Sequence, residues 1–123
     1  ADAGLDVTWT TGGSPRPMSD VTALAVYRTV QEGLTNAHKH GAGTAEASLV
    51  FAAEGVEVRV DNPVRPGDPV RAEREGGGFG LTGMRERVSA AGGTLVAEPS
   101  GDRFQVRAWF PMADANHGEG ARP

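Results

Sequence analysis

The segment from Gly78 to Gly83 reads GFGLTG and matches the pattern G-x-G-x-x-G. Both dinucleotide-binding turns and other glycine-rich phosphate cradles use this pattern. A dinucleotide-binding turn needs a buried strand directly before the first glycine, but residues 63–77, PVRPGDPVRAEREGG, are too rich in proline, glycine and charge to form one. The sequence therefore favours another phosphate cradle, in which glycines let the backbone approach the ligand and a helix begins beside it.

A second group of candidate residues lies on a long helix, expected from Ser19 or Asp20 to about His40 and ended by Gly41. With Lys39 beside them, four polar residues share one face of this helix: Arg28, Glu32, Asn36 and His40. Glu32 and Asn36, one turn apart, can offer a carboxylate and an amide oxygen to a Mg²⁺ ion that keeps several waters and is shared with phosphates. A solvated face with an i,i+4 ion pair is the alternative interpretation.

A different stripe of the same helix contains Leu24, Tyr27, Gln31, Leu34 and His38. One face can therefore pack while another carries chemistry. His38 and His40 need further ligands to bind zinc, and the remaining histidine, His117, lies in the C-terminal tail. Metal binding by histidine is not expected.

The elements that must position these groups follow from the hydrophobic pattern. We expect strands over residues 5–9, 45–53 and 56–62, a helix over about 80–91, and a hairpin over 94–110 that turns at 99–102. The strands over 45–53 and 56–62 are joined as a hairpin around residues 54–55. Two hairpins and two helices of this size predict an α+β fold with one sheet and both helices on a single face.

Composition bounds the class of protein. A chain of 123 residues is long enough for one domain, which we expect over residues 1–112. The tail over 113–123 has no apolar periodicity and is expected to be disordered. A net charge of −4 argues against a general nucleic-acid binder, and the lack of cysteine excludes disulfides and thiol chemistry. Since no long apolar run or signal peptide is present, we expect a cytoplasmic domain.

Two motifs, QEGLTNAHKH at Gln31–His40 and GFGLTGMRER at Gly78–Arg87, together resemble the ATP-binding catalytic domain of two-component sensor histidine kinases. The likeness is to the nitrate-response-type subfamily of the GHKL ATPases and extends from Leu5 to about Met112. In that family the first motif is the N box and the second is the glycine-rich box after the ATP lid. The resemblance implies a Bergerat-type fold, a two-layer α+β sandwich with a mixed, mostly antiparallel sheet, and a mobile lid over residues 63–77.

The resemblance also implies a role for each matching residue. Asn36 would bind the Mg²⁺ ion that bridges the phosphates of ATP, and Glu32 would act as the catalytic base or help to orient it. Lys39 and His40 would lie near the phosphates or the ribose. The glycine-rich box would supply the further ATP-binding residues Gly78, Phe79, Gly80, Leu81 and Gly83, with Phe79 either shielding the nucleotide or packing under the lid.

One stretch departs from the family pattern. The adenine pocket of the family has an Asp followed by glycines in a D-x-G-x-G box, whereas this chain reads VDNPVRPG from Val60 to Gly67 and lacks both glycines. Strand alternation places Asn62 in the pocket and Asp61 on the other face, although a shift of one residue would exchange them. Because an amide oxygen accepts from the adenine amine more weakly than a carboxylate does, we expect weaker ATP affinity than a full box would give.

By resemblance, the domain binds ATP and Mg²⁺ and donates the γ-phosphoryl group to a histidine on a dimerisation domain, for relay to a response regulator. The implied partners are therefore the parent's own dimerisation domain and a response regulator, and this chain alone is expected to show little turnover. The parent can be membrane-bound although this domain is not. Two alternatives stay open: an anti-sigma-factor-type GHKL serine kinase and a degenerate nucleotide-binding module without turnover.

Overall fold

The computed structural model describes residues 4–64 and 81–112. In chain order its elements are β1 (Asp6–Gly12), α1 (Asp20–His40), β2 (Thr44–Ala52), β3 (Gly55–Pro63), α3 (Leu81–Ala90), β4 (Thr94–Ser100) and β5 (Arg103–Pro111). The expected disordered tail, and the expected lid from residue 65 onward, lie outside the described residues. Two residues assigned to the lid are described: Pro63 ends β3, and Val64 is buried with only 6% exposed.

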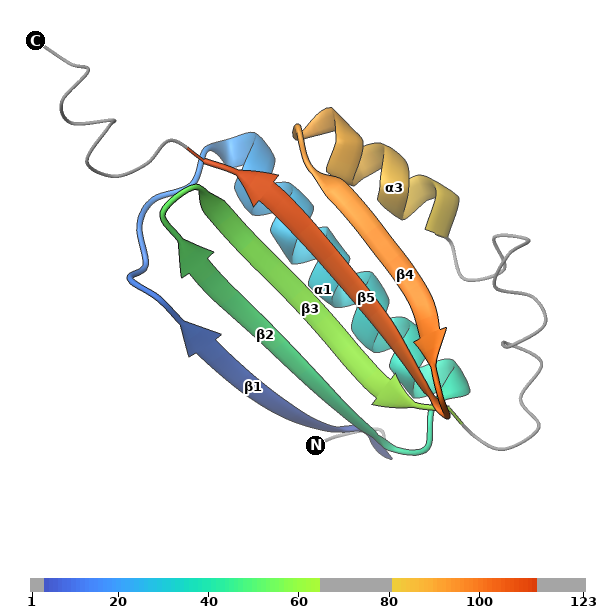
Figure 1. The fold of residues 1–123 in the computed structure, drawn as a ribbon. Coiled ribbons are helices and arrows are strands. Elements are labelled where there is room, and N and C mark those ends of the chain that lie inside the picture. Colours follow the sequence, from blue (N-terminus) through green and yellow to red (C-terminus); the bar gives the residue numbers. More distant parts are fainter. Residues whose placement is uncertain (1–3, 65–80, 113–123) are drawn as a thin grey trace, which may run out of the picture.

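The five strands form one sheet in the order β1-β2-β3-β5-β4. β1 pairs with β2 in parallel, and the other three pairings are antiparallel. Figure 1 shows α1 behind the sheet and α3 alongside β4 at the sheet's edge, with the face toward the viewer uncovered. The predicted α+β sandwich, with a mixed, mostly antiparallel sheet and helices on one face, is therefore confirmed.

Helix α1 begins and ends at the predicted residues. The Ser19 side chain caps the first turn by accepting a hydrogen bond of 3.1 Å from the Thr22 backbone N–H. At the other end the Gly41 N–H donates to the Ala37 carbonyl at 2.9 Å. A Cβ atom at position 41 would be 2.9 Å from Asn62 Nδ2, so a glycine is needed where α1 ends against the end of β3.

The packed face of α1 is not the predicted stripe. Leu24 and Tyr27 are 56% and 59% exposed, and Gln31 and His38 are exposed as well. Small or β-branched residues instead face the sheet: Thr22, Ala25, Val26, Thr29, Gly33 and Ala37. Small side chains let the helix lie close to β3, and this close packing outweighs the preference for burying the largest apolar groups.

The core lies between the helices and the sheet. Strand β3 contributes Val56, Val58 and Val60, each no more than 1% exposed, which alternate with residues on the uncovered face. From α3, Met84 and Val88 are 1% and 0% exposed. The alternation that predicts this strand also fixes the direction of each side chain at its end.

The second hairpin turns later than the sequence predicts. β4 continues through Pro99 and Ser100, and the turn consists of Gly101 and Asp102. Pro99 is tolerated within a strand here because β4 lies at the edge of the sheet. Gly101 has a positive φ of 65°, which a two-residue hairpin turn requires and glycine adopts without strain.

Candidate functional site

Glu32 of α1 points toward α3, where Arg87 meets it. Arg87 Nη2 donates a charge-assisted hydrogen bond to Glu32 Oε2, although the two residues are 55 positions apart in the chain. Each side chain is about one-third exposed. The second carboxylate oxygen, Glu32 Oε1, is buried and accepts no hydrogen bond from residues 4–64 or 81–112. The carboxylate is therefore anchored through one oxygen, and its other oxygen is an acceptor that the described residues leave unused.

Arg87 is a residue of this site that the sequence analysis did not single out. It belongs to the motif at Gly78–Arg87, but nothing in the periodicity of either helix indicates which residue of α1 it would meet. Gly83 lies one turn before it, and a Cβ atom there would be 3.6 Å from Arg87 Nη1. The absence of a side chain at Gly83 leaves the surface of α3 open beside the guanidinium group.

Asn62 lies at the end of β3 on the helix side of the sheet, as the alternation predicts. It is only 4% exposed. Its Nδ2 donates to the Pro63 carbonyl at 2.8 Å. Because a Cβ atom at Gly41 would be 2.9 Å from Asn62 Nδ2, Asn62 lies beside the end of α1, whose last turn carries Lys39 and His40 and follows Asn36.

Asp61 points to the opposite, uncovered face of the sheet. There it accepts hydrogen bonds from Arg103 Nε at 2.6 Å and from Gln105 Nε2 at 3.1 Å. Arg103 also pairs with Glu46 at 2.7 Å, so one guanidinium group joins β2, β3 and β5. The hydrogen bond that Arg103 donates to Asp61, together with the neighbouring negative charges, raises the pKa of Arg103 above its ordinary value. The sheet therefore separates Asp61 from the other candidate residues.

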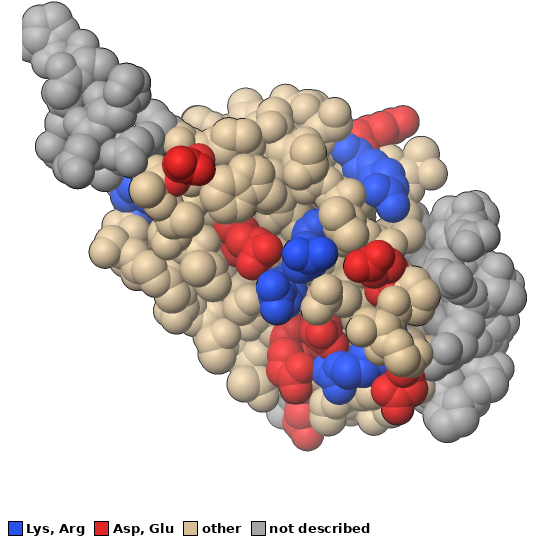
Figure 2. All heavy atoms as spheres, in the orientation of Figure 1, with Lys and Arg blue, Asp and Glu red and all other residues tan. Residues whose placement is uncertain are grey.

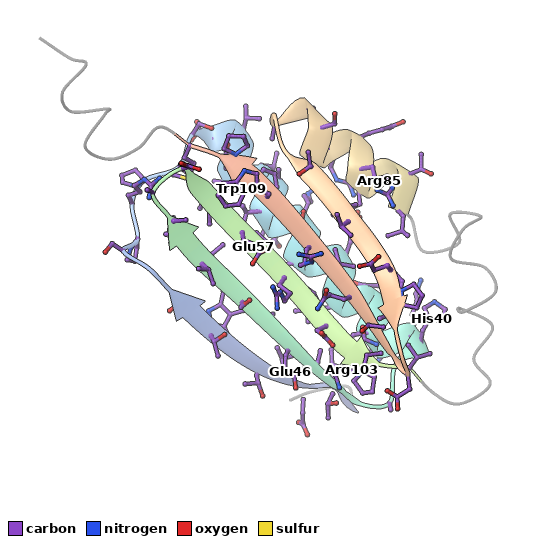
Figure 3. The ribbon with its side chains drawn as sticks, in the orientation of Figure 1. His40, Glu46, Glu57, Arg85, Arg103 and Trp109 are labelled. Carbon is purple, nitrogen blue, oxygen red and sulfur yellow. The ribbon has the colours of Figure 1, made fainter. Side chains whose placement is uncertain are left out.

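The uncovered face carries charges of both signs. Figure 2 shows acidic and basic side chains interspersed along the strands, and Figure 3 labels Glu46 and Arg103 among them. A hollow of about 210 Å³ on this side is lined by Thr8, Thr10, Glu46, Ala47, Ser48, Arg59 and Asp61. Its polar lining faces away from Glu32, so it is not an extension of the helix-side site.

The remaining candidates divide between the described residues and those outside them. Gly78, Phe79 and Gly80 lie outside the described residues. Leu81 begins α3 and is 4% exposed, and Gly83 lies in the first turn of the same helix. Within residues 4–64 and 81–112, no cluster of three or more His, Cys, Asp or Glu residues could hold a metal ion. No helix of this part is long and apolar enough to span a membrane.

Comparison with curated proteins finds bacterial sensor kinases. The chain is 32% identical over 116 residues to the sensor histidine kinase LnrJ of Bacillus subtilis, a match that covers 92% of this chain and 28% of that protein. It is 38% identical over 79 residues to the histidine-protein kinase/phosphatase UhpB of Salmonella typhimurium, covering 64% of this chain and 15% of that protein. The chain thus spans less than a third of either relative. No protein-family model matches.

Solved structures share the fold at lower sequence identity. The histidine kinase domain of the blue-light-activated kinase of Erythrobacter litoralis EL346 aligns with a TM-score of 0.65 and 20% identity, over 86% of this chain and 55% of that one. The catalytic domain of the histidine kinase ThkA aligns with a TM-score of 0.62 and 15% identity, over 90% of this chain and 81% of that one. At these identities the likeness establishes the fold alone.

Proposed function

Since the chain belongs by sequence and fold to the ATP-binding catalytic domains of sensor histidine kinases, we propose that it binds ATP with Mg²⁺ for phosphoryl transfer to a histidine. The acceptor lies on a dimerisation domain of the parent protein, and a response regulator then receives the phosphoryl group. The observation that carries the proposal is the buried Glu32 Oε1, which lies one helical turn from Asn36 and has no hydrogen-bond partner within residues 4–64 and 81–112. A buried acceptor of this kind is satisfied when a cation or its bound water meets it.

Residues further along α1 and at the end of β3 are proposed to complete a site for a magnesium nucleotide. Asn36 is the proposed ligand of Mg²⁺, with Lys39 and His40 near the phosphates or ribose and Asn62 at the adenine. Because Mg²⁺ takes few protein ligands and shares the phosphate oxygens, one amide ligand from the protein is sufficient for this proposal. When bound, Mg²⁺ neutralises charge on those oxygens.

Glu32 is the candidate proton acceptor. In the transfer, a ring nitrogen of the acceptor histidine bonds to the γ-phosphorus while the bond from that phosphorus to the bridging oxygen breaks. ADP leaves with the electron pair, and the imidazole gives up its proton to a carboxylate.

We assign the chain to the nitrate-response-type subfamily on the strength of its two motifs.

A second candidate function is nucleotide binding without turnover. The first glycine of the family's D-x-G-x-G box corresponds to Pro63 if Asp61 is the box acid, or to Val64 if Asn62 takes that position. Val64 is buried and its N–H donates to the Asp102 carbonyl at 2.8 Å, so this stretch is fixed by the fold. A fixed stretch without glycine leaves the backbone less room to approach a ligand.

Calorimetric titration tests the binding proposal. We expect Mg²⁺–ATP to bind the wild-type chain, and Asn36→Ala to remove the part of the affinity that depends on Mg²⁺. Thr35→Ala is the matched control, because Thr35 is the exposed neighbour whose hydroxyl donates to the Gln31 carbonyl of its own helix. Unchanged Mg²⁺–ATP affinity in a folded Asn36→Ala chain would contradict the assignment. Adding the parent's dimerisation domain then separates a kinase from a binding module.

A further inference from the structure

The ion pair between Glu32 and Arg87 joins the two helices across the site. Only one oxygen of the carboxylate is used, and the buried Arg87 Nε also has no hydrogen-bond partner among the described residues. A guanidinium group can bind both oxygens of a carboxylate through parallel hydrogen bonds, which would satisfy each of these groups. The observed single-oxygen contact leaves Glu32 Oε1 without a partner in the part of the chain that the structure describes, and burial of such an acceptor is unfavourable.

The packing of α3 sets where Arg87 points. Met84 and Val88, on either side of Arg87 in the chain, are buried in the core at 1% and 0% exposed. Rotating α3 about its axis would expose both, so the helix is held in one orientation. Gly83 leaves the adjacent surface open. Arg87 is consequently held toward α1, and through it the carboxylate of Glu32 is held in one direction.

We propose that Arg87 is a positioning residue, which fixes Glu32 through Oε2 so that Oε1 is presented to the Mg²⁺-bound nucleotide or its coordinating water. This inference rests on the proposed function, because the nucleotide site must exist for Oε1 to face it. Arg87 itself acts through Glu32 rather than on the nucleotide. Residues that orient a metal-associated ligand in this way typically change metal affinity or activity by about 10- to 100-fold when substituted.

A double-mutant cycle on magnesium dependence tests the proposal. The quantity to measure by calorimetry is the ratio of ADP affinities with and without Mg²⁺, for the wild type, Arg87→Gln, Glu32→Gln and the double variant. We expect Arg87→Gln to lower this ratio by about tenfold or more. In the Glu32→Gln background the same substitution should lower it no further, because Arg87 acts only through Glu32.

Two further variants separate positioning from structural support. Arg85→Gln is the matched control on the same helix, since Arg85 donates to the Leu95 carbonyl of β4 at 3.0 Å and not to α1 (Figure 3). It should leave the ratio unchanged. Arg87→Lys keeps the charge and should recover part of the ratio lost in Arg87→Gln. Denaturant unfolding without nucleotide measures the structural contribution separately.

The outcomes of these measurements distinguish a positioning role of Arg87 from a structural role and from direct contact with the nucleotide. A loss of stability in Arg87→Gln with an unchanged magnesium ratio would overturn the proposal in favour of a structural ion pair. Additive losses in the double variant would also overturn it, because Arg87 would then contact the nucleotide independently. If the wild type binds nucleotide and Arg87→Gln leaves the magnesium ratio unchanged, this inference alone is rejected. If the wild-type chain binds no nucleotide, the proposed function is rejected as well.

Discussion

Gly33 of α1 lies directly against Val60 of β3. A Cβ atom at position 33 would be 2.9 Å from both the Cβ and the Cγ2 of Val60, closer than two carbon atoms pack without displacement. Both residues are buried. Because Glu32 precedes Gly33 directly, this close approach of helix and sheet also sets the depth at which the Glu32 carboxylate lies beside α3.

We therefore expect Gly33→Ala to destabilise the fold, even though alanine favours a helix by about 1 kcal/mol over glycine. Overpacking a filled core costs about 1–3 kcal/mol and should dominate. Gly83→Ala is the control, because the added Cβ atom in α3 would meet Arg87 Nη1 at an ordinary 3.6 Å. That variant should be neutral or slightly more stable in urea unfolding. Equal effects of the two substitutions would contradict the contact.

The boundaries of α1 could be predicted from local signals, but its packed side could not. Ser19 caps the first turn of α1 and Gly41 ends the helix, and such caps are encoded within a few residues of the chain. Which face packs depends on how near the helix must come to β3. Gly33, Ala37 and Ala25 permit a close approach, whereas Leu24 and Tyr27 on that face would hold the helix away. Periodicity counts apolar residues and does not measure this distance.

The exposure of the Leu24 side gives a second prediction. Leu24→Ala should change the free energy of unfolding by no more than about 0.5 kcal/mol, as is usual for surface positions. Met84→Ala on α3, a large-to-small change at a residue only 1% exposed, should cost about 2–5 kcal/mol. Denaturant unfolding of both variants measures the difference. A comparable loss for Leu24→Ala would mean that this side of α1 is packed after all.

Arg103 joins Asp61 and Glu46 on the uncovered face. Since its pKa is raised in the folded state, its stabilising contribution is complete below the ordinary arginine value and is lost only as the pH rises through the higher folded value. We expect Arg103→Gln to cost up to about 1 kcal/mol, because the pair is partly exposed to solvent. The cost should be the same at pH 7 and pH 9 and smaller in high salt. A cost that disappears at pH 9 would contradict this assignment.

The candidate site was predictable to the extent that it depends on neighbours along one element. Glu32 and Asn36 lie one turn apart on a helix, and Asn62 and Asp61 lie on opposite faces of a strand, so their relative directions follow from backbone periodicity. The partner of Glu32 could not be found in this way. Arg87 reaches it through the packing of α3 on α1, which depends on the shapes of Met84 and Val88 within the core.

Asn62→Asp should affect folding and nucleotide binding in opposite directions. In the nucleotide-free protein the change should cost about 1–3 kcal/mol, because the amide that donates to the Pro63 carbonyl at 2.8 Å becomes a buried acceptor facing another acceptor. If Asn62 meets the adenine amine, the carboxylate gains a charge-assisted hydrogen bond when nucleotide binds. ADP affinity should then rise by on the order of 1 kcal/mol. Unfolding with and without saturating ADP measures both effects, since a ligand of the folded state stabilises it in proportion to its affinity.

Asp61→Asn supplies the matched control for this measurement. It weakens the hydrogen bonds with Arg103 and Gln105 on the uncovered face, where none of the other candidate nucleotide residues lies, so its cost should be equal with and without ADP. The cost of Asn62→Asp should shrink when ADP is present, because only the helix-side residue meets the ligand. An ADP-dependent cost for Asp61→Asn, with none for Asn62→Asp, would place the adenine against Asp61 and reverse the assignment of the two strand-end residues.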